Sequence, residues 1–343
     1  MRLEGGDKKN RSRKRRRKWI IGLVLTGAII SGPSAPSLNQ EPVKVHFIDV
    51  GQGDAIYIQL PEHNDILIDA GDADYGDDVV NYLKAQGMDK LELLVATHPH
   101  EDHIGGLPEV MAAFQVDQVI DSGLAVQSQC YELYRQAAEA ELCTWLADDH
   151  QVFDFAGAQL QILTGDEIWS DVNDYSVVAR LDCGDVEFLF MGDAEKEAEA
   201  CLPGDISAEI LKVGHHGSST STSREFLNRV DPQVAVISVM EDNAYGLPDL
   251  NILAMLHNCG AEIFRTDIRG SIVITTDGKR QHIRSGRIKQ VYSLGMKISH
   301  SRLANLPLTK NRQNAEIFFL YKDRQYCKQT LQVCCPLSKM CLE

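Results

Sequence analysis

The segment LLVATHPHEDHIGG, residues 93–106, places four side chains that can bind a metal directly after an apolar run. Residues 93–96 predict a buried strand, and Pro99 together with the 105–106 glycine pair predicts a loop after it. Imidazole nitrogens combined with a carboxylate suit zinc, and also manganese or iron. The spacing therefore predicts a metal site at the end of a strand, built from His98, His100, Asp102 and His103.

HPHEDH, residues 98–103, resembles the HxHxDH signature of the metallo-β-lactamase superfamily. This resemblance implies an α/β (α+β) fold, a four-layer αββα sandwich with its metal site at one end of two facing sheets. Three further motifs, DVGQGDA (49–55), ND-x-S (173–176) and GHHGS (214–218), resemble the exported ComEC-like metallo-hydrolase domain and its stand-alone relatives. The superfamily supports many reactions, so the resemblance specifies the site more closely than the substrate.

The resemblance covers residues 43–278, and the order of elements expected from hydrophobic periodicity matches the first half of such a sandwich. Strands are expected at 43–50, 55–60, 65–68, 91–96, 118–120, 151–154, 158–163, 177–181, 186–191, 210–213 and 233–239. Helices are expected at 79–86, 107–114 and 128–141, and a final strand pair follows residue 265.

The net charge of −15 conceals a strong asymmetry along the chain. Residues 1–18 hold ten Lys/Arg and two Asp/Glu, residues 284–343 hold eleven and three, and residues 19–283 hold 13 and 44, a net of −31. So acidic a body repels polyanions and does not suit a nucleic-acid binder that relies on a basic surface, although bound divalent cations offset part of the charge locally. Secretion or salt adaptation is the alternative explanation of the acidity.

Three regions are expected: 1–42, 43–283 and 284–343. The first has a basic run followed by the apolar stretch WIIGLVLTGAII (19–30), which is typical of an export signal. The stretch is shorter than the roughly 20 residues of a full membrane span. A cleaved signal and an uncleaved membrane anchor both place residues 43–283 outside the membrane, whereas a cytosolic protein with a basic start is the other interpretation.

Residues 284–343 resemble nothing in the family and hold four of the nine cysteines. A helical appendage, a disordered basic tail and a shifted reading frame all stay open for them. Elsewhere Cys130 and Cys143 are one candidate disulfide pair, although sequence alone does not fix connectivity.

The resemblance implies two divalent ions, Zn or Mn. His98 and His100 hold one ion, with Asn173 or Asp174 as a weak third ligand, because the histidine usual in that part of the superfamily is absent. The alternative role of this pair is to shape the turn. Oxygen ligands there would tolerate manganese as well as zinc.

The same resemblance implies that the second ion is held by Asp102, His103 and His215. Asp193, at the end of strand 186–191, bridges the two ions, and its alternative role is a helix N-cap. Asp102 acts as ligand or base, and His216 acts as a substrate contact or proton donor.

The outer residues of the site follow from the same motifs. Asp49 and Asp54 are expected to support the ligand loop through hydrogen bonds, or simply to form turns. Leu247 stands where the relatives carry a histidine. Substrate contacts are expected from Ser218, Asn243 and Tyr245.

Together these observations predict an exported binuclear hydrolase, a phosphodiesterase or nuclease that acts on DNA or on a cell-envelope phosphodiester. A water between the ions would lose a proton near neutral pH and attack phosphorus. No obligate protein partner is expected, and residues 19–30 would provide any membrane anchor. The alternatives are an acyl hydrolase of lactonase or β-lactamase type and a non-enzymatic DNA-uptake or envelope binding module.

Overall fold

A computed structural model of the chain describes residues 41–141, 144–147, 151–163 and 168–286. The expected export segment and the tail beyond residue 286 lie outside these residues. Within them, no helix is both long and apolar enough to cross a membrane.

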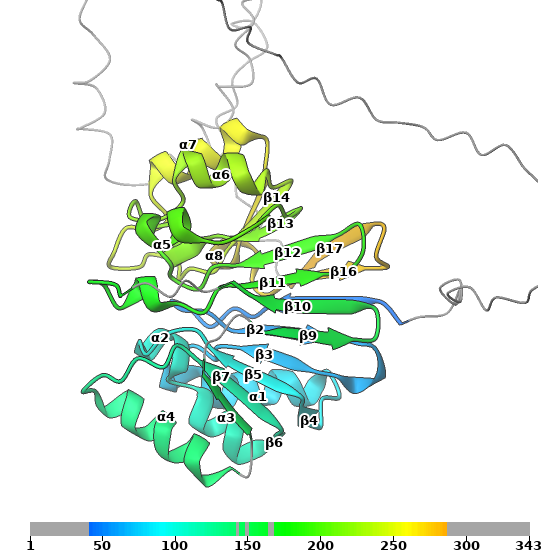
Figure 1. The fold of residues 1–343 in the computed structure, drawn as a ribbon, viewed down its shortest axis with the longest axis vertical. Helices are drawn as coiled ribbons and strands as arrows, with labels where there is room; N and C mark the ends of the chain where they lie inside the picture. The colour runs from blue at the N-terminus through cyan, green and yellow to red at the C-terminus, as the bar shows by residue number, and fades with distance from the viewer. Residues whose placement is uncertain (1–40, 142–143, 148–150, 164–167, 287–343) are drawn as a thin grey trace, which may run out of the picture. The chain divides into compact units, whose positions relative to one another are not determined.

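Two sheets face each other at the centre of the molecule (Figure 1). The first sheet has the strand order β17-β16-β1-β2-β3-β5-β7-β8. Its strands are β1 (Val43–Phe47), β2 (Ile56–Gln59), β3 (Ile66–Ile68), β5 (Leu93–Ala96), β7 (Gln118–Asp121), β8 (Thr144–Ala147), β16 (Ile272–Thr276) and β17 (Gln281–Ser285). A separate short ladder joins β4 (Lys90–Leu91) to β6 (Gln115–Val116).

The second sheet has the order β15-β14-β13-β12-β11-β10-β9. Its strands are β9 (Val152–Phe155), β10 (Ala158–Ile162), β11 (Ala179–Asp182), β12 (Glu187–Phe190), β13 (Ile210–Lys212), β14 (Val234–Ile237) and β15 (Glu262–Arg265). Strands β9 to β12 pair antiparallel, and β12 to β15 pair parallel.

Helices cover the outer face of each sheet, which gives four layers (Figure 1). The helices beside the first sheet are α1 (Gly76–Ala85), α2 (Glu101–Ile104), α3 (Leu107–Ala113) and α4 (Gln129–Ala140). Those beside the second are α5 (Lys196–Cys201), α6 (Arg224–Val230) and α7 (Leu250–Cys259), and α8 (Thr266–Arg269) follows β15. The predicted αββα sandwich is confirmed.

Side-chain alternation explains how each strand serves two layers. On β1, Val45 and Phe47 enter the core between the sheets, whereas His46 points to the helical side and its Nδ1 lies 3.0 Å from the hydroxyl of Tyr82. On β13, Ile210 faces the inter-sheet core and Leu211 the outer helices. Strands buried on both faces read as continuous apolar runs.

The structure departs from the sequence-based expectations in a few places. Residues 101–104 form the one-turn helix α2 rather than a loop, and α6, α7, α8 and β15 were not predicted. Strand β17 continues to Ser285, two residues past the expected boundary. Cys130 is a free thiol, and its suggested partner Cys143 lies outside the described residues.

Candidate metal centre

The predicted ligand loop leaves the carboxyl end of β5 and turns into α2. His98 and His103 are buried, whereas His100 is exposed. His98 Nε2 lies 2.9 Å from His100 Nδ1, so the two imidazoles meet at one point. Ligands from the end of a buried strand are held by a rigid element, as a metal site requires.

Asp193 comes from the second sheet, three residues after β12. Its Oδ1 lies 3.3 Å from His103 Nε2, and its Oδ2 lies 4.0 Å from His98 Nε2 and 3.5 Å from His216 Nε2. The two carboxylate oxygens therefore face imidazoles carried by both sheets. The N-cap interpretation of Asp193 does not apply, because α5 begins at Lys196.

The GHHG turn after β13 carries two consecutive histidines with left-handed backbone, φ 47° at His215 and 51° at His216. His216 is buried, and its Nδ1 donates to the carbonyl of Ser238 at 2.9 Å. That hydrogen bond leaves Nε2 facing Asp102 Oδ2 at 3.4 Å. His216 thus points into the centre of the ligand group.

His215 lies at the rim of the same group and is partly exposed. Its Nδ1 donates to Glu195 Oε1 at 2.9 Å, and its Nε2 lies 3.8 Å from Asp193 Oδ2. Thr220 Oγ1 is a further neighbour of Nδ1, at 3.2 Å. The glutamate fixes the direction of the ring, and it had not been singled out from the sequence.

Asp69 is the main contributor that sequence reasoning missed. It follows β3 in left-handed conformation (φ 57°) and is fully buried. Its carboxylate accepts from Thr97 N at 2.8 Å, from Thr97 Oγ1 at 2.6 Å and from His103 Nδ1 at 2.7 Å. This contact directs His103 Nε2 towards Asp193. A carboxylate on the second ring nitrogen of a ligand histidine is a common outer support of metal sites.

Asn173 and Asp174 take different positions beside the centre. The side chain of Asp174 accepts from the backbone N–H of Glu195 at 2.9 Å and of Ala198 at 3.4 Å, so it supports the start of α5. Asn173 Nδ2 donates to Glu195 Oε1 at 3.4 Å, whereas its buried Oδ1 has no hydrogen-bond partner among the described residues.

The three residues expected to contact substrate lie on two loops. Ser218 Oγ is 2.9 Å from Thr220 Oγ1. Asn243 uses its whole amide within its own loop, donating to the carbonyls of Met240 and Leu247 and accepting from the N–H groups of residues 245 and 247. The side chain of Tyr245 is exposed. Of the three, Asn243 has a clear structural use.

Asp49 and Asp54 differ in a similar way. The backbone N–H of Asp49 donates to Ser271 Oγ at 3.0 Å, at the end of β1. Asp54 is buried beside the ligand loop: its N–H donates to the carbonyl of Asp102 at 3.1 Å, and its Oδ1 lies 3.8 Å from His216 Nδ1. Only Asp54 of this pair is placed against the candidate ligands by these contacts.

Electrostatics in this pocket favour positive charge. Burial lowers the pKa of His98 far below its usual value, which leaves a neutral imidazole. Burial also opposes protonation of His216, but Asp193, Asp102 and Asp54 raise its pKa to about 10. The pKa of Asp193 is held well below its usual range by His216 and His103 despite burial. Asp193 therefore stays ionised, and its negative charge favours protonation of the neighbouring imidazoles of His216 and His103.

These residues fit a divalent cation by donor chemistry as well as position. Three sets of three residues each bring one nitrogen or oxygen atom per residue within 4.8 Å of the other two. The buried atoms His103 Nε2, Asp193 Oδ1 and His216 Nε2 form no hydrogen bond within the described part of the chain. Buried polar atoms without partners carry a large cost unless another group satisfies them. The three sets with atoms within 4.8 Å are His98–His103–Asp193, Asp102–His103–His216 and Asp54–Asp69–His103.

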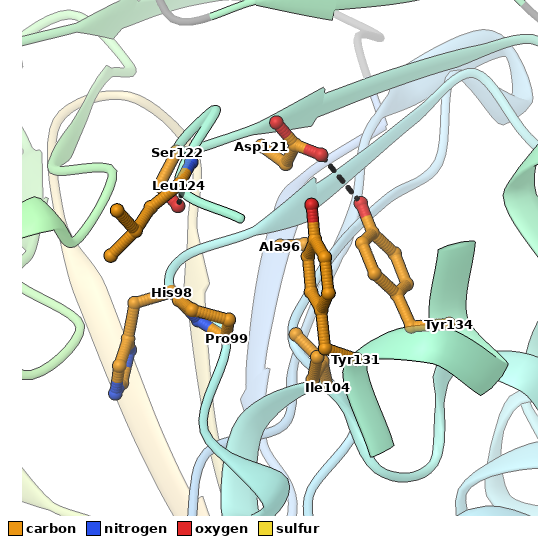
Figure 2. A pocket seen from close by; sticks show the side chains of 9 residues that line it. All are labelled: Ala96, His98, Pro99, Ile104, Asp121, Ser122, Leu124, Tyr131 and Tyr134. Atoms are coloured by element: carbon orange, nitrogen blue, oxygen red, sulfur yellow. Dashed lines mark hydrogen bonds between the residues drawn. The ribbon is translucent and has the colours of Figure 1, made fainter. Parts of the chain in front are cut away.

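A small recess borders His98 on the side of α4 (Figure 2). Pro99, Leu124 and Tyr131 are among its lining residues, and Tyr134 donates to Asp121 Oδ2 at 3.2 Å at its far end. Burial raises the pKa of Tyr134 far above its usual value, so its hydroxyl stays a donor. This side of the centre packs against His98 with mainly apolar and aromatic groups.

Comparison with known proteins agrees with this geometry. A sequence model of the metallo-β-lactamase superfamily matches residues 48–240. The chain belongs to this superfamily. It is 29% identical over 259 residues to ComE operon protein 3 of Bacillus subtilis (strain 168), covering 69% of this chain and 33% of that protein. It is 31% identical over 263 residues to competence protein ComA of Neisseria gonorrhoeae, covering 75% and 35%. The resemblance to ComEC-like proteins is thereby confirmed.

This chain spans about one third of the length of these two relatives. Among solved structures it is similar to the metallo-β-lactamase fold protein YhfI from Bacillus subtilis, with a TM-score of 0.47 and 12% identity. That similarity covers 69% of this chain and 100% of the other.

Proposed function

We propose that this protein is a metal-dependent hydrolase that uses two divalent cations, Zn or Mn, to cleave phosphodiesters. One observation carries the proposal. Buried nitrogen and oxygen atoms of His103, Asp193 and His216 that form no hydrogen bond within the described residues converge from three separate segments and two sheets. Such convergence has an evident use only if a cation satisfies the donors.

The geometry supports one ligand set for each cation. His98 and His100 would hold the first, with Asn173 as a weak third ligand, since its buried Oδ1 has no hydrogen-bond partner within the described residues. Asp193 would bridge, since its two oxygens face different imidazoles. The second cation would be held by Asp102, His103 and His216.

This assignment exchanges the roles first expected for the two histidines after β13. His216 lies within a ligand group, whereas His215 does not, among the residues described. His215 would instead face substrate from the rim, oriented by Glu195. Bound cations would lower the pKa of a water ligand and offset the charge that develops on a phosphoryl group.

The chain's own residues determine what else happens at the centre. Asp102 is partly exposed, with Oδ2 3.4 Å from His216 Nε2, so it can accept a proton or bind a cation. His215 is positioned to accept a proton from bound water or substrate, because its Nδ1–H is donated to Glu195 and Nε2 carries the lone pair. His98 and His103, fully buried, exclude bulk water from the floor of the site.

The net charge of this chain and the name of a relative support a proposal for the substrate class. One relative is named a competence protein, which favours DNA or another envelope polymer as the phosphodiester. A body with net charge −31 over residues 19–283 repels such a polyanion, so bound cations would be needed to attract it. We further propose export through residues 1–42, with residues 19–30 as signal or anchor.

The test combines metal analysis with turnover. Purified protein should contain up to two Zn or Mn per chain and hydrolyse bis-(p-nitrophenyl) phosphate. His98→Ala and Asp193→Ala should each lower metal content and rate. Turnover of nitrocefin or of a lactone would support the acyl hydrolase instead of the phosphodiesterase. Salt-dependent DNA binding without metal would support the non-enzymatic binding module. Unchanged metal content and rate in both variants would refute the proposal.

A further inference from the structure

A buried lysine pairs with Asp54 beside the candidate metal centre. Lys212 ends β13, and it is the one lysine with a buried side chain among the residues that the structure describes. Its Nζ lies 2.6 Å from Asp54 Oδ2 and donates to the carbonyl of Val213 at 3.0 Å. An apolar pair of similar size would avoid the desolvation penalty of burying two charges, so fold stability alone gives this pair no evident use.

The pair joins the two sheets at the end where the ligands gather. Asp54 belongs to the loop between β1 and β2, and Lys212 belongs to the second sheet. The ligand turn with His216 begins two residues after Lys212. One contact therefore links the ligands of the first sheet to those of the second.

Asp54 contacts the ligands of both sheets through separate atoms. Its N–H donates to the carbonyl of Asp102 at 3.1 Å, and its Oδ1 lies 3.8 Å from His216 Nδ1. Gly53 permits this approach: a Cβ there would lie 2.1 Å from the carbonyl oxygen of Asp102. A shift of Asp54 would therefore affect both Asp102 and His216, which belong to the second ligand set.

Without a fixed partner, the same carboxylate would be free to become a ligand. Asp54 forms a compact donor group with Asp69 and His103, all within 4.8 Å. The ammonium of Lys212 lies 2.6 Å from Asp54 Oδ2 and so already pairs this oxygen with a positive charge. Oδ1 lies 3.8 Å from His216 Nδ1, which donates its proton to the carbonyl of Ser238.

We propose, on the basis of the function proposed above, that Lys212 is a positioning residue. Its ammonium keeps the Asp54 carboxylate out of the metal centre. Through Asp54 it holds His216 towards Asp102 and Asp193. Lys212 itself touches neither cation nor substrate.

The test measures cation binding without any substrate. Mn²⁺ binding is followed by electron paramagnetic resonance and calorimetry in the wild type, in Asp54→Asn and in the double variant Lys212→Met/Asp54→Asn. We expect the double variant to fold and to bind the second cation about 10–100-fold more weakly, as losses of outer supports usually do. Asp54→Asn keeps the shape of the side chain and removes its negative charge. The affinity of this variant for the second cation therefore tests the inference if the double variant does not fold.

A second ion pair provides the matched control. Arg180 Nη2 and Glu187 Oε1 lie 2.8 Å apart on β11 and β12, and neither belongs to a candidate ligand group among the described residues. Arg180→Met/Glu187→Gln should change stability but leave both Mn²⁺ affinities unchanged.

Two outcomes separate this inference from the proposed function. Wild-type Mn²⁺ affinities in both Asp54→Asn and the double variant would overturn the positioning role and leave the hydrolase proposal standing. A wild-type protein that binds neither Mn²⁺ nor Zn²⁺ would overturn both. A fall in kcat for bis-(p-nitrophenyl) phosphate at unchanged KM, parallel to the loss of the second cation, would support the inference further.

Discussion

Asp69 Oδ2 accepts a hydrogen bond from His103 Nδ1 at 2.7 Å, and the opposite nitrogen of that ring lies 3.3 Å from Asp193 Oδ1. The first contact decides which nitrogen of His103 carries the proton. In the neutral ring that binds a cation, Nε2 is thereby left with a lone pair directed at the centre. A residue of the first sheet thus prepares a ligand to meet a carboxylate of the second.

Asp69→Asn should weaken cation binding about 10–100-fold, because a neutral amide replaces the carboxylate that accepts three hydrogen bonds. Asparagine tolerates the left-handed backbone at this position, so the variant should fold. Calorimetric titration with Zn²⁺ measures the effect. Asp72→Asn is the control, since its N-cap bond to the N–H of residue 74 is available to either side chain. Equal affinity in the two variants would contradict the role of Asp69.

Cation binding at pH 7 should release protons. Burial opposes protonation of His216 and His103, but the surrounding carboxylates raise the pKa of His216 to about 10 and hold that of His103 well above its usual value. Both imidazoles must lose a proton to bind a cation, so affinity should rise with pH. Calorimetry in buffers of different ionisation enthalpy counts the protons. Binding without proton release would contradict the assignment of these ligands.

His216→Ala and His215→Ala should differ in stoichiometry. Removing His216 takes away a buried ligand atom, so we expect one cation per chain instead of two. Removing His215 takes away a rim imidazole held by Glu195, so we expect two cations and a lower kcat. Elemental analysis after gel filtration measures both. The reverse result would return His215 to the ligand set.

His46 should make the fold sensitive to acid independently of the metal centre. Burial, with a smaller effect of Lys44, lowers its pKa from 6.5 to about 4. Between these two values the unfolded chain binds a proton that the folded chain does not. The free energy of unfolding therefore falls as pH drops from 6.5 towards 4, by about 3 kcal/mol at most. Above pH 6.5 this contribution is constant.

The variant His46→Phe keeps an aromatic ring beside Tyr57 and Tyr82 and cannot be protonated. Its stability relative to the wild type should rise steadily below pH 6.5, while loss of the contact to the Tyr82 hydroxyl adds an offset independent of pH in this range. Urea denaturation at several pH values between 4.5 and 7.5 measures the difference. Parallel curves for the two proteins would show that His46 is not the group responsible.

Much of the architecture was accessible from the sequence, because apolar periodicity and strand-end motifs carry direct physical meaning. Strand β5 with its HPHEDH loop, and β12 with Asp193, were placed correctly to within two residues. Helix α2 was missed because one turn of EDHI has too few residues for a 3.6-residue period to appear. Loop signals from Pro99 and the glycine pair outweighed it.

The site was harder to predict where roles depend on side-chain direction. His215 and His216 are adjacent, and both have left-handed backbone, so neither strand nor helix periodicity tells which ring points inward. Asp69 looked like an ordinary turn residue at the end of β3. Lys212 was read as part of an apolar strand, although a charged residue inside ILKV was itself the available signal.

Strand β1 lies between β2, its neighbour in sequence, and β16, with Val45 opposite Ile274. One edge of β1 therefore stays open during synthesis until more than two hundred further residues have been made. Closing so long a loop slows folding, and an exposed strand edge in the meantime invites association with other chains. Folding of this protein should consequently be late and slow relative to translation, with the newly made first half dependent on protection from aggregation until β16 arrives.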